Sequence, residues 1–108
     1  MRRVLDAHAV LAYLEREPGA GVVEAALNRA AEHDQPLLLT TVNWGEILYT
    51  VLRECGEEQA VRVERLLASF PIELVPVDQT LARVAAWFKA RGRISYADCC
   101  AAALARQL

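Results

Sequence analysis

The stretch Arg3-Val4-Leu5-Asp6-Ala7-His8-Ala9-Val10-Leu11 decides the fold of the chain. Val4 and Leu5 predict a short apolar strand, and a helix over residues 7–15 is predicted to begin directly after Asp6. A strand that ends at Asp6 places this carboxylate at the carboxyl end of a sheet, where ligands bind in open α/β sheets. An Asp at this position also caps the following helix. A functional site therefore requires other residues that reach Asp6.

The composition indicates a single folded domain over residues 1–108. Of the 108 residues, 55% are hydrophobic and 24% are charged, which is typical of a globular chain. The net charge of −2 argues against a surface that attracts nucleic acid by its overall charge. The densest basic patch is Arg91-Gly92-Arg93.

The sequence favours a cytoplasmic location and no contact with a membrane. The first apolar run is interrupted at Asp6, and no later run has the length of a membrane span. The three cysteines, Cys55, Cys99 and Cys100, form no C-x-x-C pair. We interpret them as buried, reduced thiols.

The hydrophobic pattern predicts strands that alternate with helices. The predicted strands span residues 4–5, 37–39 and 72–77, and five of the predicted helices span residues 7–15, 21–33, 57–70, 78–91 and 95–108. Residues 40–43 are predicted to lead into one more helix, which ends near residues 55–56. Pro76 confines the third strand to a sheet edge because proline cannot donate a ladder hydrogen bond. This alternation favours the α/β class, with a parallel sheet layered between helices.

Three acids in the chain are predicted to converge. Asp6, Glu46 and Asp98 lie near the N-termini of predicted helices, and right-handed crossovers bring such junctions to one edge of the sheet. Carboxylates held close together raise one another's pKa unless a cation lies between them. A cluster of oxygen ligands suits Mg²⁺ or Mn²⁺, and such a site can activate water for in-line attack on a phosphodiester.

Helix capping is the competing explanation for these acids. Asn43-x-x-Glu46 and Ser95-x-x-Asp98 both fit a capping box. An acid in a first turn also gains about 0.3–1 kcal/mol from the helix dipole. However, apolar and small residues flank Glu46 and Asp98, and an unpaired charge in such surroundings is costly. These flanks favour a functional site.

Three segments of the chain carry a family resemblance: Val4-Leu5-Asp6-Ala7-His8-Ala9-Val10-Leu11-Ala12-Tyr13-Leu14-Glu15-Arg16-Glu17-Pro18-Gly19, Thr41-Val42-Asn43-Trp44-Gly45-Glu46-Ile47-Leu48-Tyr49, and Ala90-Arg91-Gly92-Arg93-Ile94-Ser95-Tyr96-Ala97-Asp98-Cys99-Cys100-Ala101-Ala102-Ala103-Leu104-Ala105. In this order they resemble the PIN domain (PilT N-terminal domain) of small VapC-type toxin ribonucleases. The resemblance implies a PIN-like three-layer fold with a short parallel sheet.

The resemblance also implies a function. It points to a Mg²⁺- or Mn²⁺-dependent endoribonuclease, the toxin of a type II toxin–antitoxin system, with Asp6, Glu46 and Asp98 as metal ligands and catalytic residues. The implied partners are an RNA substrate, a cognate antitoxin and a second copy of the chain.

Two features of the chain depart from the family pattern. His8 stands where the family has a small hydroxyl residue, and we interpret it as a surface imidazole, with an extra ligand or proton carrier as the alternative. The family continues beyond the last helix into a strand that carries a fourth acid. The resemblance therefore implies that the C-terminal strands are missing and that Val4-Leu5 exposes an unpaired edge.

A catalytically inactive interaction or dimerisation module is the competing function. Two further classes fit the sequence less well. A phospho-acceptor receiver domain would need a lysine near the acids, and the single lysine, Lys89, lies in mid-helix. A dinucleotide-binding domain would need a glycine fingerprint after the first strand, which the chain lacks.

Four more residues are predicted to act on the substrate. Thr41 and Asn43 would orient ligands or phosphate, with helix capping as the alternative, and Arg91 and Arg93 would contact the RNA backbone. The aromatic residues of the helices are predicted to pack in the core or a dimer interface and not to stack on bases: Trp44, Trp87 and Phe88.

Overall fold

A sheet of three parallel strands forms the centre of the protein, whose computed structural model describes residues 2–108. The strands are β1 (Val4–Leu5), β2 (Leu37–Thr40) and β3 (Ile72–Val75), and their order in the sheet is β1-β2-β3. Val4 lies opposite Leu38, and Leu37 lies opposite Ile72. Because all three strands are parallel, their carboxyl ends lie at the same edge of the sheet.

Six helices within residues 2–108 complete the fold. They are α1 (Ala7–Leu14), α2 (Ala20–Glu32), α3 (Thr41–Cys55), α4 (Glu57–Ser69), α5 (Gln79–Arg91) and α6 (Tyr96–Gln107). The predicted α/β class with a parallel sheet is confirmed, and the helix bounds differ from the predicted ones by one residue in most cases. The third strand ends at Val75 and not at residue 77, because Pro76 has no N–H with which to continue the ladder.

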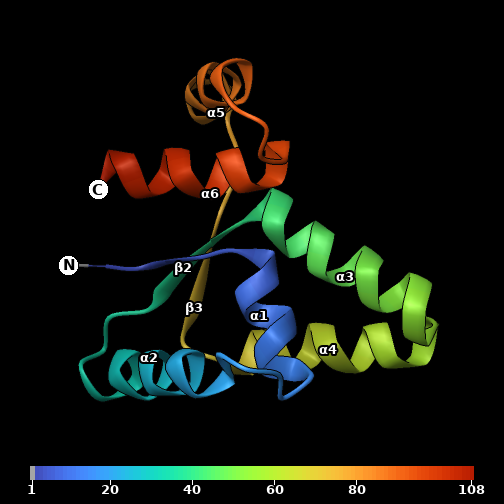
Figure 1. Cartoon of the computed structure of the whole chain (residues 1–108). Helices are drawn as coiled ribbons and strands as arrows, with labels where there is room; N and C mark the ends of the chain where they lie inside the picture. The colour runs from blue at the N-terminus through green and yellow to red at the C-terminus, as the bar shows by residue number, and fades with distance from the viewer. Residues whose placement is uncertain (1) are drawn as a thin grey trace.

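The two faces of the sheet bury two separate hydrophobic cores. Leu38 packs on one face among residues of α5 and α6, whereas Leu37 and Leu39 pack on the other face with residues of α1 to α4. Successive side chains of a strand point to opposite faces, which accounts for this division. Figure 1 shows α5 and α6 on one side of the strands and α1, α2 and α4 on the other. The expected three-layer arrangement is confirmed.

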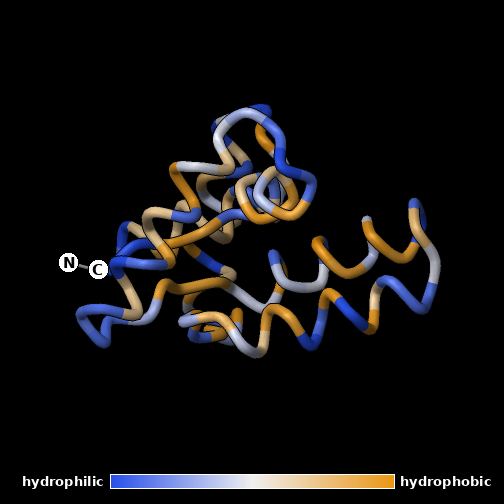
Figure 2. The backbone as a smooth tube through the Cα atoms, turned by 90° about the horizontal axis from the view of Figure 1, so that it is seen from below, coloured by the Kyte–Doolittle hydropathy of each residue, from blue (hydrophilic) through white to orange (hydrophobic). Residues whose placement is uncertain are grey.

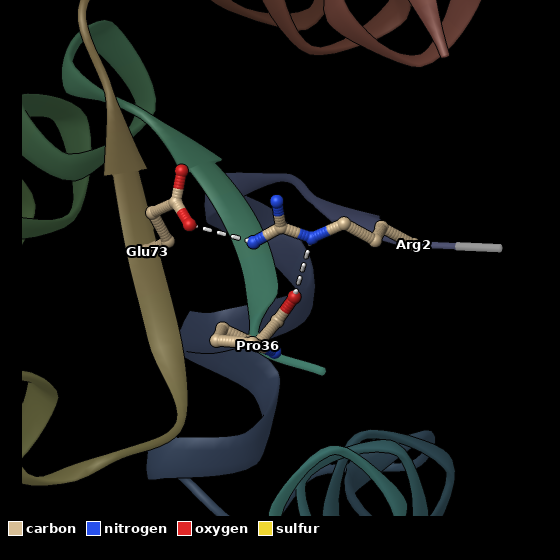
Figure 3. A network of polar contacts seen from close by, with 3 residues as sticks. All are labelled: Arg2, Pro36 and Glu73. Atoms are coloured by element: carbon tan, nitrogen blue, oxygen red, sulfur yellow. Dashed lines mark hydrogen bonds and ion pairs between the residues drawn. The ribbon is translucent and has the colours of Figure 1, made fainter. Parts of the chain in front are cut away.

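Strand β1 is short and lies at one end of the sheet. Within residues 2–108 no strand pairs with its outer side, as the resemblance implied. Arg2 extends the contact of this N-terminal segment to β3: its Nη2 donates to Glu73 at 2.7 Å, and its Nε donates to the Pro36 carbonyl at 3.4 Å (Figure 3). The ion pair is partly exposed, so its contribution to stability is small, about 0.2–1 kcal/mol.

The helices are amphipathic, and their apolar stripes face the two cores. Figure 2 shows hydrophobic and hydrophilic residues alternating turn by turn along the helices. In the part of the chain that the structure describes, no helix has both the length and the apolar character needed to cross a membrane. Cys99 and Cys100 are fully buried as predicted, but the prediction for Cys55 is wrong because this residue is exposed at the end of α3.

Candidate metal centre

Asp6 lies directly after β1 and is the N-cap residue of α1. Its Oδ1 accepts a hydrogen bond of 2.7 Å from the Ala9 amide. The capping role that the sequence allowed for Asp6 is therefore real. It leaves the other carboxylate oxygen, Oδ2, without a hydrogen bond from the described residues. Capping holds this carboxylate in one orientation and keeps an oxygen available for a ligand.

Asp98 lies in the first turn of α6 and borders the same space as Asp6. Its amide donates to Oγ of the N-cap residue Ser95 at 3.1 Å. A hollow of about 450 Å³ beside β1, which we call the carboxylate hollow, is lined by Val4, Asp6, His8, Asp98, Ala101, Ala102 and Ala105. The structure thus brings Asp6 and Asp98 together, and it places the exposed His8 beside them.

Neither predicted capping box is completed by its acid. The N-cap residue of α3 is Thr40 and not Asn43, so Glu46 lies in the second turn of the helix. Ser95 does cap α6, but within residues 2–108 the carboxylates of Glu46 and Asp98 form no hydrogen bond or ion pair. Capping therefore does not account for these two side chains.

Glu46 is half-buried and lies within electrostatic reach of the other two acids. Burial raises the pKa of Glu46 above its usual value of 4.5, and the negative charges of Asp98 and Asp6 raise it further. The solvent around this side chain screens part of the repulsion. A cation among the three carboxylates would remove the repulsion, which is the behaviour expected of metal ligands.

Asn43 links the helices that carry Glu46 and Asp98. It is fully buried; its Oδ1 accepts a hydrogen bond from Thr40 Oγ1, and its Nδ2 donates to the Ala97 carbonyl at 3.1 Å. The backbone N–H of Asn43 also donates to Thr40 Oγ1 at 3.0 Å. The prediction that Asn43 caps α3 is wrong, because the strand continues to Thr40 and the next residue already begins the helix. Asn43 instead joins α3 to α6.

The other predicted substrate contacts lie outside the carboxylate hollow. Thr41 is exposed, and its Oγ1 accepts a hydrogen bond of 3.2 Å from the Val77 amide. Arg91 lies at the end of α5, where its guanidinium carbon is 5.6 Å from the centroid of the Trp87 ring. Arg93 is exposed in the turn between α5 and α6. Their contacts with RNA stay predictions.

The donor set of this edge suits a hard divalent cation. Carboxylate oxygens are the ligands that Mg²⁺ and Mn²⁺ prefer, and a neutral imidazole can also bind a metal. No group of three His, Cys, Asp or Glu side chains among residues 2–108 is arranged as a complete metal site. The chemistry of the residues fits a metal, but binding would have to bring the carboxylates of Asp6, Glu46 and Asp98 closer together.

One group of residues was missed by the sequence interpretation. Trp87 exposes 64% of its surface, so it does not pack in the core of the single chain, and its packing in a dimer interface stays a prediction. It lies in a second hollow with arginines that include Arg83 and Arg106. The spacing of Arg83, Trp87 and Arg91 at i, i+4 and i+8 on one helix was a usable signal, because such residues share a face.

The parallel sheet and the acids at its carboxyl edge define a PIN-like α/β domain. A model of the PIN domain family matches residues 3–108, and the chain therefore belongs to the PIN domain family. Among solved structures, the chain is similar to VapC20 of Mycobacterium tuberculosis, a Sarcin-Ricin loop cleaving toxin, with a TM-score of 0.60 and 21% sequence identity. The match covers 67% of this chain and 58% of the VapC20 chain, and it shows a shared fold. No curated protein sequence matches the chain.

Proposed function

We propose that the protein is a metal-dependent endoribonuclease and the toxin of a type II toxin–antitoxin pair. The observation that carries the proposal is the shared hollow of Asp6 and Asp98, with Glu46 in electrostatic reach of both. Membership of the PIN domain family and the fold shared with a toxin that cleaves the sarcin-ricin loop support it. A cytoplasmic location goes with this proposal.

The chain would hold Mg²⁺ or Mn²⁺ through Asp6, Glu46 and Asp98. When bound, such an ion supplies an activated water and stabilises the oxygen that leaves the phosphodiester. The Ala9 amide orients Asp6, and the Ser95 cap orients the first turn of α6 that carries Asp98. The link from Asn43 to Ala97 keeps the helices of Glu46 and Asp98 together. These contacts prepare the carboxylates before a metal arrives.

A protein partner is part of the proposal. A hollow of about 460 Å³ between α3 and α4 has a largely apolar lining, with exposed Tyr49, Leu52 and Val61. Exposed apolar residues gathered in one place are typical of protein–protein interfaces. This groove supports the prediction of a protein partner, and either the antitoxin or a second copy of the chain could occupy it.

The test combines RNA cleavage with metal binding. We expect Mn²⁺ to raise the Tm of the wild-type chain and to support RNA cleavage that EDTA abolishes. Asp6→Asn and Asp98→Asn should remove the metal-dependent rise in Tm and lower kcat/KM on the order of 1000-fold, since metal coordination contributes several kcal/mol to catalysis.

Asp34→Asn is the matched control for these variants. Asp34 lies in the turn before β2, at the opposite edge of the sheet, and its φ of 51° is one that Asn adopts readily. The control removes the same charge and should change neither readout. RNA cleavage that persists in Asp6→Asn and Asp98→Asn would contradict the nuclease assignment. The absence of any metal response would favour an inactive interaction module.

A further inference from the structure

A second hollow lies on the surface of α5 and α6, and we infer that it binds single-stranded RNA beside the carboxylates. This basic hollow has a volume of about 400 Å³ and is lined by Arg83, Val84, Trp87, Phe88, Arg91, Arg106 and Gln107. In this arrangement a base stacks on Trp87 while the arginines bind the flanking phosphates. The inference extends the proposed nuclease function, because it assigns a place for the substrate strand outside the metal centre.

The charge of the chain is divided in a way that the net value conceals. Residues 79–108, which include α5 and α6, contain five Lys and Arg residues and a single acid, Asp98. Residues 1–78 contain seven basic and thirteen acidic residues. The lining of the basic hollow has three arginines and no acid. A local positive surface of this kind attracts a polyanion even when the whole chain is negative.

The basic hollow has an aromatic platform as well as charge. Trp87 is 64% exposed, whereas the neighbouring Phe88 packs partly into the core beneath it. The Arg91 guanidinium carbon lies 5.6 Å from the Trp87 ring centroid, and that of Arg106 lies 5.7 Å from the Phe88 ring centroid. Aromatic rings interleaved with arginines are the pattern by which proteins bind single strands, because bases stack on the rings.

Helix α6 connects the basic hollow with the carboxylate hollow. Asp98 and Ala105 line the carboxylate hollow, and Arg106 and Gln107 line the basic hollow. From Asp98 to Arg106 the helix rises about 12 Å, a span that a short oligonucleotide can bridge. A strand held on the basic hollow can therefore extend along α6 toward the carboxylates.

A second copy of the chain fits the basic hollow less well than RNA does. In a two-fold symmetric dimer the same patch faces itself, so the arginines of both copies would meet and repel. An acidic peptide would neutralise Arg83, Arg91 and Arg106 but would leave the exposed face of Trp87 without a stacking partner. Single-stranded RNA satisfies both the charges and the ring.

The test measures binding separately from cleavage. A fluorescently labelled single-stranded oligouridylate is titrated with the full chain in EDTA, where a metal-dependent nuclease is inactive. We expect Trp87→Ala to weaken binding about 5- to 150-fold, the usual effect of removing one stacked base contact. Trp87→Phe should retain most of the affinity. Arg91→Ala and Arg106→Ala should weaken binding and lower its salt dependence.

Arg65→Ala is the matched control, because Arg65 is an exposed arginine on α4, away from both hollows. It should bind like the wild type. Wild-type affinity in both Trp87→Ala and Arg91→Ala would overturn the inference. So would displacement of the oligonucleotide by an equal concentration of polyglutamate, or a dimer that Trp87→Ala dissociates, since these identify a peptide or a second copy as the occupant.

The same experiment separates this inference from the proposed function. Suppose that binding depends on Trp87 but the chain cleaves no RNA with Mn²⁺. This result would support RNA binding at the basic hollow and contradict the proposed nuclease activity. Cleavage that depends on Asp98, with binding unaffected by Trp87→Ala, would support the proposed nuclease activity and contradict RNA binding at the basic hollow.

Discussion

The carboxylate hollow and the basic hollow are both bordered by α6 and are similar in size, about 450 and 400 Å³, but they differ in charge and construction. The first is lined by two acids and a histidine, and the second by three arginines and two aromatic rings. The proposed metal ion would bind in the first hollow, and the proposed RNA strand would bind on the second. The net charge of −2 averages over these two environments and describes neither of them.

The two hollows also differ in how firmly their functional groups are held. Asp6 is oriented by a backbone amide, and Asp98 lies in a capped first turn. Arg91 and Arg106 are long, exposed side chains that lie over aromatic rings. Hydrogen bonds therefore fix the residues at which the reaction would occur. The arginine side chains of the surface proposed for RNA can instead change conformation to fit a strand.

The largest expected effect is on the kinetic constants, because variants of the two hollows should change different constants. Asp6→Asn preserves the helix cap, because Asn and Asp cap equally well, but it removes a negative ligand, so kcat should fall on the order of 1000-fold. Arg106→Ala should leave kcat unchanged and raise KM about 5- to 10-fold, as expected for the loss of uniform substrate binding. Steady-state cleavage of an oligoribonucleotide measures both constants. A fall in kcat with Arg106→Ala would show that the hollows do not act separately.

The next effect concerns the link that positions α6 for both hollows. Asn43→Ala should lower the free energy of unfolding by about 2 kcal/mol, a fall of roughly 8 °C in Tm, because a buried hydrogen bond to Thr40 and a partly buried one to Ala97 are lost. Thr41→Ala, which removes one exposed contact with Val77, is the control and should cost less than about 1 kcal/mol. Thermal denaturation followed by circular dichroism measures both values. Equal losses of unfolding free energy in the two variants would contradict the role of Asn43 in joining α3 to α6.

A smaller effect should appear in the salt dependence of RNA binding. In EDTA, Arg91→Ala should reduce the slope of log K against log salt by about 0.7, the value for one phosphate contact on a single strand. Asp98→Asn should leave this slope unchanged, because a carboxylate releases no counterion from RNA. Fluorescence anisotropy at several salt concentrations supplies the slopes. An identical slope for Arg91→Ala and the wild type would remove Arg91 from the RNA surface.

The smallest expected effect concerns the pH dependence of stability in the metal-free chain. Because burial and the charges of Asp98 and Asp6 raise the pKa of Glu46 above 4.5, the ionised form destabilises the fold at neutral pH. Lowering the pH through the raised pKa protonates Glu46 and restores this stability. Glu46→Gln should therefore raise Tm at pH 7 by about 1–2 °C. The effect is small because solvent screens part of the repulsion between the carboxylates.

The advantage of Glu46→Gln should disappear as the pH falls below 4.5, where the wild-type carboxyl becomes protonated in both the folded and the unfolded chain. Differential scanning calorimetry in EDTA across this range checks the sign. Mn²⁺ should reverse the order of the two chains, since the variant lacks a ligand. A variant that is less stable at pH 7 without metal would show that Glu46 has a favourable partner.

Much of the fold could be predicted because it depends on local chemistry. The third strand lies at a sheet edge, as Pro76 predicted, and Asp78 caps α5 through a hydrogen bond of 2.9 Å from the Leu81 amide, as expected. The continuous apolar run Leu37-Leu38-Leu39 predicted a strand buried on both faces, and all three residues are buried. Turn and cap residues act within a few positions of the chain, so their effects are visible in the sequence.

The candidate site could be predicted only in part. Asp6 and Asp98 do border one hollow, but Asn43 does not cap α3 and Trp87 is not in the core of the single chain. Asn43 matched a capping box by spacing, yet the actual cap depends on where β2 ends, which pairing with β3 decides. Trp87 was expected in the core or in a dimer interface, and its exposure in the single chain depends on the side of α5 that faces the sheet.

The sequence by itself determined the class of fold, the order of its elements and the three acids at the carboxyl edge, because periodicity, capping and strand direction are encoded in neighbouring residues. Only the tertiary structure decided that Arg83, Arg91 and Arg106 meet beside an exposed ring, and that Asn43 joins α3 to α6. These contacts connect residues far apart in the chain. They exist only after burial of two hydrophobic cores has placed α5 and α6 together on one face of the sheet.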